Sequence, residues 1–141
     1  MKQVWQIDPE FRRLSVLLSP EEENRLESSL LREGCKEPIA VWHGCILDGH
    51  KRYEICSYEE MDYKTVEMNF VSREDAIIWI CKKRVKESSA NKTIYKYLVG
   101  KWYNAEKKRI HAKQKEKRRK SLDLAIKQKG EEGQLVSIPV N

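Results

Sequence analysis

A run of fourteen residues near the C-terminal end of this 141-residue chain is too basic to join a hydrophobic core. Lys107–Lys120 reads KKRIHAKQKEKRRK and contains nine basic residues, with Glu116 as its one acid. Residues 1–100 hold 16 basic and 17 acidic residues, whereas residues 101–141 hold 12 and 5, so the last part carries the whole excess of +6. Because burying unpaired charge is costly, we expect a folded N-terminal part followed by a charged segment that projects from it.

Such a run repels itself unless an anion lies alongside, and the phosphates of nucleic acid are the commonest anionic partner. We therefore expect DNA as a partner, and a solvated helix face or chain-end tail is the alternative. The candidate contacts are Lys107, Lys108, Arg109, Lys113, Lys115, Lys117, Arg118, Arg119 and Lys120. The run lacks the large apolar face of a membrane-surface helix, and no stretch approaches the ~18 apolar residues of a membrane span, so no membrane partner is expected.

The N-terminus and the cysteines favour a cytoplasmic protein without a metal site. Residues 1–8 lack the charged-then-apolar layout of a secretory signal. The four cysteines lie ten or more positions apart, so none forms the C-x2-C pair of a zinc or redox site. The three histidines do not cluster either. We expect reduced, mostly packed thiols.

Short apolar runs predict a small sheet. Residues 37–42 and 45–47 are separated by two residues that favour a hairpin turn, so we expect two antiparallel strands there. Residues 63–68 alternate between polar and apolar and favour a further strand. Residues 4–7 predict a short edge strand, because the proline of Asp8-Pro9 stops a ladder of hydrogen bonds.

Capping signatures predict where two helices begin. Ser19-Pro20-Glu21-Glu22 combines a capping serine, an early proline and an acid three residues after the cap, and Ser72-Arg73-Glu74-Asp75 is a second such signature. A polar break follows the second helix. We therefore expect a core of residues 1–90, a long helix over residues 91–129 that is basic in its second half, and a flexible tail of residues 130–141.

The first half of the long helix carries an apolar stripe of Ile94, Leu98, Trp102 and Ala105. These positions recur at helical spacing and lie on one face. The stripe packs either against its own domain or against a second copy of the chain. A homodimer through the long C-terminal helix is therefore one of two open readings.

The stretch Asp48-Gly49-His50-Lys51-Arg52 carries the clearest chemical signal, because it joins a predicted strand to a predicted helix. The first backbone N–H groups of a helix have no internal partner and favour an anion. Gly49 lets an anion approach the backbone, and His50, Lys51 and Arg52 add donors. Alternatively, the two cations are ordinary exposed residues and Asp48 caps the helix or pairs with Arg52.

Four stretches together resemble a ParB-like N-terminal domain, of the kind found on plasmids, phages and integrative elements. They are residues 19–22, 34–42, 46–55 and 72–80. The resemblance covers roughly residues 4–108, and LDGHKRYEI is its most specific part. It implies an α+β fold shared with sulfiredoxin, in which helices flank a small mixed β-sheet and a long basic helix follows here.

The resemblance also implies a function. Gly49, Lys51 and Arg52 would hold a phosphate with His50 beside them, and the ligand would be CTP or ATP with Mg²⁺. The role would be in partition, replication or transcription regulation on DNA, with a nucleoid- or plasmid-associated location. His50 takes the place of the reactive cysteine of sulfiredoxin, so sulfinic-acid repair is not expected.

Two departures from the family pattern bear on these expectations. Relatives carry an Arg-Arg-Asn triplet where this chain has Glu87-Ser88-Ser89-Ala90-Asn91, and no helix-turn-helix follows the long helix. The alternative function is that of an enzyme, either a nucleotide hydrolase (CTPase or ATPase) or a metal-dependent nuclease. Asp48 and Glu54 flank the phosphate stretch, but no catalytic residue is assigned.

Overall fold

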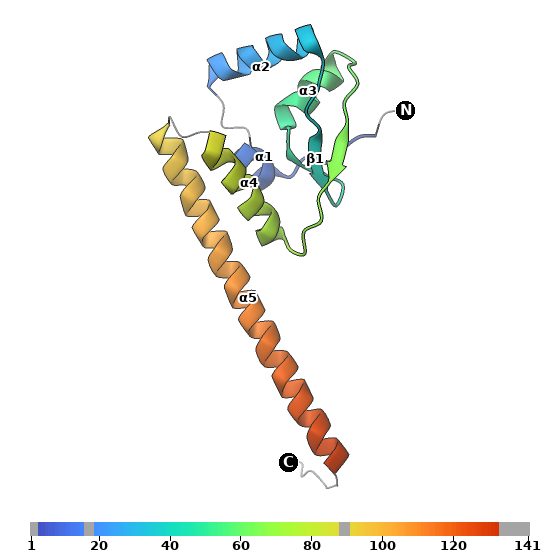
Figure 1. Ribbon diagram of the computed structural model, residues 1–141, viewed down its shortest axis with the longest axis vertical. Coiled ribbons are helices and arrows are strands. Elements are labelled where there is room, and N and C mark those ends of the chain that lie inside the picture. Colours follow the sequence, from blue (N-terminus) through green and yellow to red (C-terminus); the bar gives the residue numbers. More distant parts are fainter. Residues whose placement is uncertain (1–2, 16–18, 88–90, 133–141) are drawn as a thin grey trace. The chain divides into compact units, whose positions relative to one another are not determined.

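The computed structural model describes residues 3–15, 19–87 and 91–132, within which the chain forms five helices and three strands (Figure 1). The chain divides into two compact units, residues 1–105 and residues 106–141, which are described separately below. Among the described residues, no helix is both long enough and apolar enough to cross a membrane.

The sheet of the first unit contains β1 (Ile39–Trp42), β2 (Cys45–Asp48) and β3 (Thr65–Glu67) in the order β2-β1-β3. β1 pairs antiparallel with β2 and parallel with β3, so the sheet is mixed, as the resemblance implies. The predicted hairpin is confirmed, and His43 and Gly44 form its turn with φ of 50° and 77°. β3 is shorter than the predicted strand over residues 63–68.

The predicted edge strand over residues 4–7 is wrong. Only Gln6 bridges to the sheet, at Cys45. The chain instead turns into α1 (Pro9–Ser15), because the Asp8 carboxylate accepts the N–H groups of Glu10 and Phe11 at 3.0 and 3.2 Å. Asp8-Pro9 is therefore a helix cap followed by a first-turn proline, rather than the end of a strand.

Both predicted capping signatures are confirmed. α2 (Pro20–Glu33) begins with a reciprocal capping box, in which the Glu22 N–H donates to Ser19 Oγ and the Ser19 N–H donates to the Glu22 carboxylate. α4 (Arg73–Glu87) begins where the Asp75 N–H donates to Ser72 Oγ at 3.2 Å. Both helices therefore begin where local hydrogen bonds satisfy their first N–H groups.

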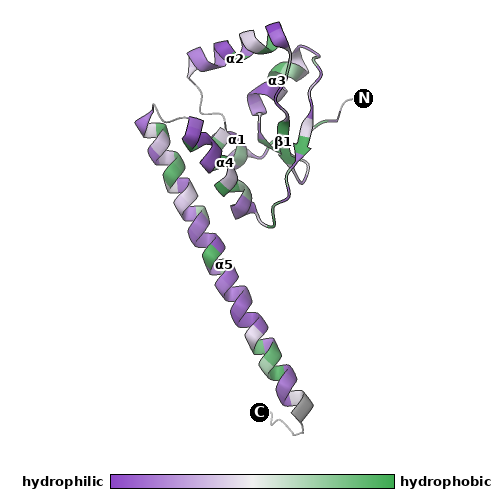
Figure 2. Ribbon diagram, viewed as in Figure 1, coloured by the Kyte–Doolittle hydropathy of each residue, from purple (hydrophilic) through white to green (hydrophobic). Residues whose placement is uncertain are grey.

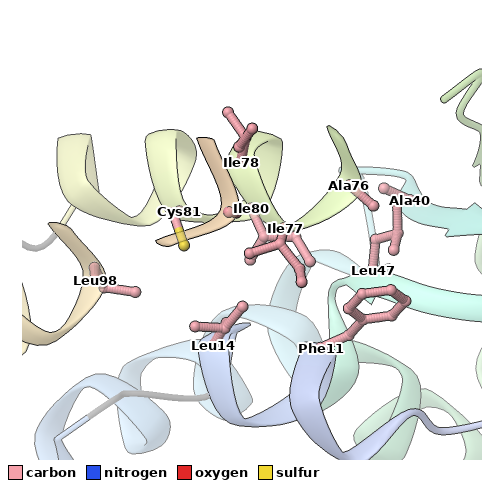
Figure 3. Close-up of a cluster of buried hydrophobic side chains, with 11 residues drawn as sticks. Phe11, Leu14, Ala40, Leu47, Ala76, Ile77, Ile78, Ile80, Cys81 and Leu98 are labelled. Atoms are coloured by element: carbon pink, nitrogen blue, oxygen red, sulfur yellow. The ribbon is translucent and has the colours of Figure 1, made fainter. Parts of the chain in front are cut away.

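The main core lies where α1 and α4 meet the sheet, with the first turns of α5 (Lys92–Glu132) beside them. In Figure 3, Phe11 and Leu14 of α1 face Ile77 and Ile80 of α4, and Leu98 of α5 lies beside Cys81 and Leu14. Leu98 has no exposed surface. Burying these side chains together is the main source of the unit's stability.

A second cluster lies elsewhere on the sheet, where Ile39, Val41 and Ile46 pack with Trp5, Tyr53 and Tyr63. Tyr53 belongs to α3 (His50–Tyr58), which packs against both β1 and α2. Helices therefore pack beside the end of β2, and this arrangement positions the candidate site described below.

The apolar stripe of α5 packs onto its own unit, because Leu98 and Ala105 are buried and Ile94 and Trp102 pack against the same core. The compact first unit accordingly includes these first turns of α5, up to Ala105. α5 continues through Gly130 to Glu132, three residues beyond the end expected at residue 129. A helical glycine costs only about 1 kcal/mol, which neighbouring helix formers offset. The predicted break at residues 88–90 and the tail beyond residue 132 lie outside the described residues.

Candidate functional site

A cavity of about 350 Å³ lies where β2 ends and α3 begins. Ser15 of α1, Arg25 of α2 and Lys83 of α4 line it together with Asp48 and His50. The predicted stretch from residue 48 to residue 52 thus lies in the wall of a cavity, and all five of its residues line it. We call this the α3 cavity.

The backbone at the start of α3 is open to a ligand. Gly49 is the N-cap, with φ 101° and ψ 24°, and no side chain caps the helix. The first helical hydrogen bond runs from the Tyr53 N–H to the Gly49 carbonyl at 2.8 Å, so the three preceding N–H groups have no acceptor within the helix. The positive φ favours glycine, and a Cβ at position 49 would also be crowded, 3.2 Å from both Arg52 Nη2 and Ile39 Cγ1.

Asp48 is an ion-pair partner and not the helix cap. Its Oδ2 accepts hydrogen bonds from Arg52 Nη2 at 3.2 Å and from Lys83 Nζ at 2.5 Å, and its side chain is 11% exposed. The sequence left open whether Asp48 caps the helix or pairs with Arg52. The structure has the second arrangement and adds Lys83.

Lys51 and Arg52, the two cations of the predicted site, both have acidic neighbours. Arg52 donates to the carbonyls of Glu37 and Pro38 at 3.1 and 3.3 Å, in addition to its bond with Asp48. Lys51 is held more loosely, with its ammonium 3.7 Å from Glu23 and 3.5 Å from Glu54. Arg52 is therefore fixed in the wall of the cavity, whereas Lys51 can turn toward an incoming anion at small cost.

His50 is buried at 1% exposure and has one of its two ring nitrogens engaged. Its Nδ1 lies 2.5 Å from Ser15 Oγ, and its Nε2 has no partner among the described residues. Burial and then the nearby Arg12 cation lower the pKa of His50 from 6.5 to about 4, so the ring is neutral at pH 7. The Ser15 hydroxyl oxygen lies 3.5 Å from the Arg12 carbonyl oxygen, which is long for a hydrogen bond. We therefore assign the Ser15 hydroxyl as the donor to His50 Nδ1, which leaves Nδ1 without a hydrogen of its own. Nε2 then carries a hydrogen, which makes it a donor.

The side chains that line the α3 cavity nearly balance in charge. The cations are Arg25, Lys51, Arg52, Lys83 and Arg84. The acids are Glu22, Glu37, Asp48 and Glu87. The net side-chain charge therefore offers an anion little attraction, so the α3 N–H groups and His50 Nε2 would matter to an anion as much as side-chain charge would.

Sequence reasoning did not assign several lining residues to the site, among them Ser15, Arg25, Lys83 and Arg84. Lys83 and Arg84 belong to the basic triplet at residues 82–84, which is a usable signal. No sequence signal pointed to Ser15, because the helix α1 that carries it was not predicted. Glu87, the first residue of the stretch that replaces the family's basic triplet, accepts a hydrogen bond from Arg84 at 2.9 Å.

The two carboxylates that flank the stretch have different partners. Asp48 binds Arg52 and Lys83, whereas Glu54 accepts from Arg12 at 2.9 Å. Within the part of the chain that the structure describes, no three histidines, cysteines or acids gather as metal ligands.

The predicted DNA-contacting residues lie in the second unit, on α5. We call residues 107–120 the basic segment. No side chain from residue 106 to residue 130 is buried, and eight of the nine predicted basic residues are exposed, the exception being half-buried Arg109. Arg109 pairs with Glu106 and Arg119 with Glu116. Figure 2 shows mostly hydrophilic residues along these turns, with a hydrophobic patch near the helix end.

Comparison with known proteins gives a likeness in fold. No protein-family model matches the sequence. No curated protein matches it at a significant level either. A solved structure of a Pnob8-like ParB-N domain, in its C2221 crystal form, matches with a TM-score of 0.67 at 22% identity. The match covers 79% of this chain and 46% of that one, so this chain spans about half the length of its neighbour. The fold is therefore that of a ParB-like N-terminal domain, as the sequence resemblance implied.

Proposed function

We propose that this chain is a DNA-associated binding module whose basic segment contacts the phosphates of duplex DNA. The observation that carries the proposal is an exposed helical segment with nine basic residues and one acid, in a unit whose described side chains bury no core. Neither helix propensity nor packing explains such an excess of positive charge. The excess is explained if a polyanion lies along the helix and neutralises it.

The contact would be independent of DNA sequence. At 1.5 Å per residue, the segment is on the order of 20 Å long, which is enough to reach several phosphates. Lysine and arginine contacts to phosphate position a protein and carry no base information. Each phosphate neutralised adds about −0.9 to the slope of log affinity against log salt.

Partition, replication or transcription regulation of a mobile element is the biological setting that we propose. It is supported by the ParB-N fold and by the basic segment together. The setting fits a cytoplasmic protein that is associated with a nucleoid or plasmid. A homodimer through α5 would have to use residues beyond Ala105, such as the exposed Leu122 and Ile126, because the earlier stripe is buried in its own unit.

Anisotropy of a labelled duplex of about 30 base pairs, measured at low and moderate salt, tests the DNA proposal. Replacing Lys113, Lys115, Lys117 and Lys120 with glutamine should weaken binding ~10–100-fold and flatten the salt slope. The matched control removes four charges from exposed lysines of the first unit, namely Lys36, Lys64, Lys92 and Lys96. Equal losses in the two variants, or binding that ignores salt, would rule out the assigned surface.

The second element of the proposal is phosphate binding in the α3 cavity, with CTP or ATP and Mg²⁺ as the candidate ligands. The residues fit a phosphate, because the first N–H groups of α3 have no acceptor within the helix and no side chain caps them. In addition, His50 Nε2 is buried and has no hydrogen-bond partner among the described residues. Gly49, His50 and Lys51 would hold the phosphate. Arg52 would contribute only if its bond to Asp48 gave way. The metal would supply charge neutralisation of the phosphates.

Calorimetric titration with CTP, ATP and inorganic tripolyphosphate tests this second element. Lys51→Gln should lower the affinity ~3–10-fold, because it removes one near-site cation without disturbing the core. Lys36→Gln makes the same charge change at a more exposed lysine outside the cavity and should leave the affinity unchanged. Absence of heat with all three ligands would refute phosphate binding here and would leave the DNA proposal standing.

A further inference from the structure

A second cavity in the first unit lies between α4 and the first turns of α5, with a volume of about 490 Å³. Its wall consists of Trp79, Lys82, Lys83, Val85, Lys86 and Trp102. Every lining residue is therefore aromatic, aliphatic or basic, and none is acidic. This composition differs from that of the α3 cavity, where acids and cations nearly balance.

The two indoles are partly embedded in the fold and partly open. Both Trp79 and Trp102 pack against the main core and are half-buried. Their remaining surface lines this second cavity, which we call the groove. The core therefore holds each ring in place, so each indole has little side-chain entropy left to lose on binding.

Lysine side chains already approach both ring faces. Lys82 Nζ lies 5.4 Å from the centre of the Trp102 ring, and Lys83 Nζ lies 5.6 Å from the centre of the Trp79 ring. Both distances are near the outer limit of a cation–π contact, about 6 Å. The faces of the indoles are thus directed toward the cations of the groove and not only toward the protein interior.

The three lysines differ in how available they are. Lys83 also donates to Asp48, so its charge is shared with the α3 cavity. Lys82 and Lys86 are exposed and lie four residues apart on one face of α4. These two ammonium groups form an anion-binding edge beside the indoles.

We propose that this groove binds single-stranded nucleic acid, with unpaired bases stacking on the indoles of Trp79 and Trp102 and the adjoining phosphates on Lys82 and Lys86. Aromatic faces beside a positively charged groove are the recurring means by which proteins hold single strands. Duplex DNA does not offer its base faces, because they are stacked inside the helix. A purely acidic peptide would satisfy the lysines and leave the indoles without a planar partner.

The experiment separates base stacking from charge, and it separates the groove from the basic segment. All variants carry glutamine at Lys113, Lys115, Lys117 and Lys120, so that binding along α5 is weakened. The probes are a labelled thymidine 12-mer, an abasic 12-mer with the same number of phosphates, and a glutamate-rich peptide of equal charge. Anisotropy should give about 10-fold tighter binding to the thymidine strand than to the abasic strand.

Trp102→Leu should reduce that preference to about 2-fold or less, because leucine keeps an apolar side chain but gives no stacking surface. Lys82→Gln with Lys86→Gln changes only exposed positions and should weaken binding of both strands equally. Lys92→Gln with Lys96→Gln is the matched control and should change neither. Equal affinity for thymidine and abasic strands, or equal binding of the peptide, would overturn the proposal. Because duplex binding is measured separately, failure here leaves the proposed function intact.

Discussion

The two units of this chain handle charge in opposite ways. Residues 1–105 contain 17 basic and 17 acidic residues, whereas residues 106–141 contain 11 and 5. In the first unit the charged groups of the α3 cavity pair with one another, as Asp48 does with Arg52 and Lys83. In the second, nine basic residues face one acid over residues 107–120.

This contrast indicates which groups in each unit would contribute most to the binding of a polyanion. In the first unit an anion must compete with carboxylates already in place, so open backbone N–H groups and neutral donors matter most. In the second unit few such competitors are present, so the proposed DNA binding should depend strongly on salt. Fold stability should also differ sharply between the units, since only the first has a core among its described residues.

The largest expected effect compares two leucines of the same helix. Leu98→Ala removes a side chain with no exposed surface and should destabilise the first unit by about 2–5 kcal/mol. Leu122→Ala, at 62% exposure, should change the free energy of unfolding by less than about 0.5 kcal/mol. Urea unfolding followed by circular dichroism measures both. A large loss in Leu122→Ala would mean that the second unit has a packed partner.

Next in size is the pH dependence due to His50. Its pKa of about 4 in the fold lies below the ordinary value of 6.5, so the unfolded chain binds the proton more readily. Stability should therefore fall as pH decreases from 6.5 to about 4, by up to ~3 kcal/mol, and should be fully present above that window. Urea unfolding at about pH 7, 5.5 and 4.5 measures the slope. His50→Gln should flatten it, and an unchanged slope would show that other groups cause it.

A smaller effect is expected from breaking the charge balance of the α3 cavity. Asp48→Asn removes the carboxylate shared by Arg52 and Lys83, and should cost about 1–3 kcal/mol of stability. It should also strengthen tripolyphosphate binding several-fold, because two cations lose their internal partner. Calorimetric titration checks the second result. Glu67→Gln, at an exposed position of β3, makes the same charge change and should alter neither quantity.

The smallest effects compare two glycines. Gly49→Ala places a Cβ at φ 101° and 3.2 Å from two heavy atoms, so it should cost about 1–2 kcal/mol. Gly100→Ala lies within α5, where a Cβ meets no atom within 4 Å, and should gain about 0.5–1 kcal/mol. Thermal unfolding should show shifts of opposite sign. A neutral Gly49→Ala would mean that the start of α3 can relax, which would weaken the argument for a preformed anion site.

Much of the fold was predictable from residues close together in sequence. Ser19 and Ser72 cap helices as predicted, and His43-Gly44 makes the predicted turn, since each depends on hydrogen bonds spanning a few residues. Asp8-Pro9 is the exception, because the same pair can stop a strand or begin a helix. The seven-residue α1 that follows is too short for periodicity to decide between them.

The candidate site was predictable only in part. The stretch from Asp48 to Arg52 lies beside a cavity, as its sequence suggested. Two other residues of the cavity are distant in sequence: Ser15 precedes its partner His50 by 35 residues, and Lys83 follows its partner Asp48 by 35 residues. The groove between Trp79 and Trp102 likewise brings together two helices. Such contacts between distant residues depend on how the helices pack, and a local sequence pattern does not predict that packing.

The sequence by itself determined that residues 107–120 stay outside any core and carry the net charge, because nine cations cannot be buried together in so short a run. Only the tertiary structure decided which charges remain to meet a ligand. Arg52 is neutralised by its neighbours, and Lys82 and Lys86 lie beside two indoles. One buried ring nitrogen of His50 has no hydrogen-bond partner among the residues that the structure describes. Charge is fixed by composition, but its availability depends on partners that only packing brings within a few ångströms.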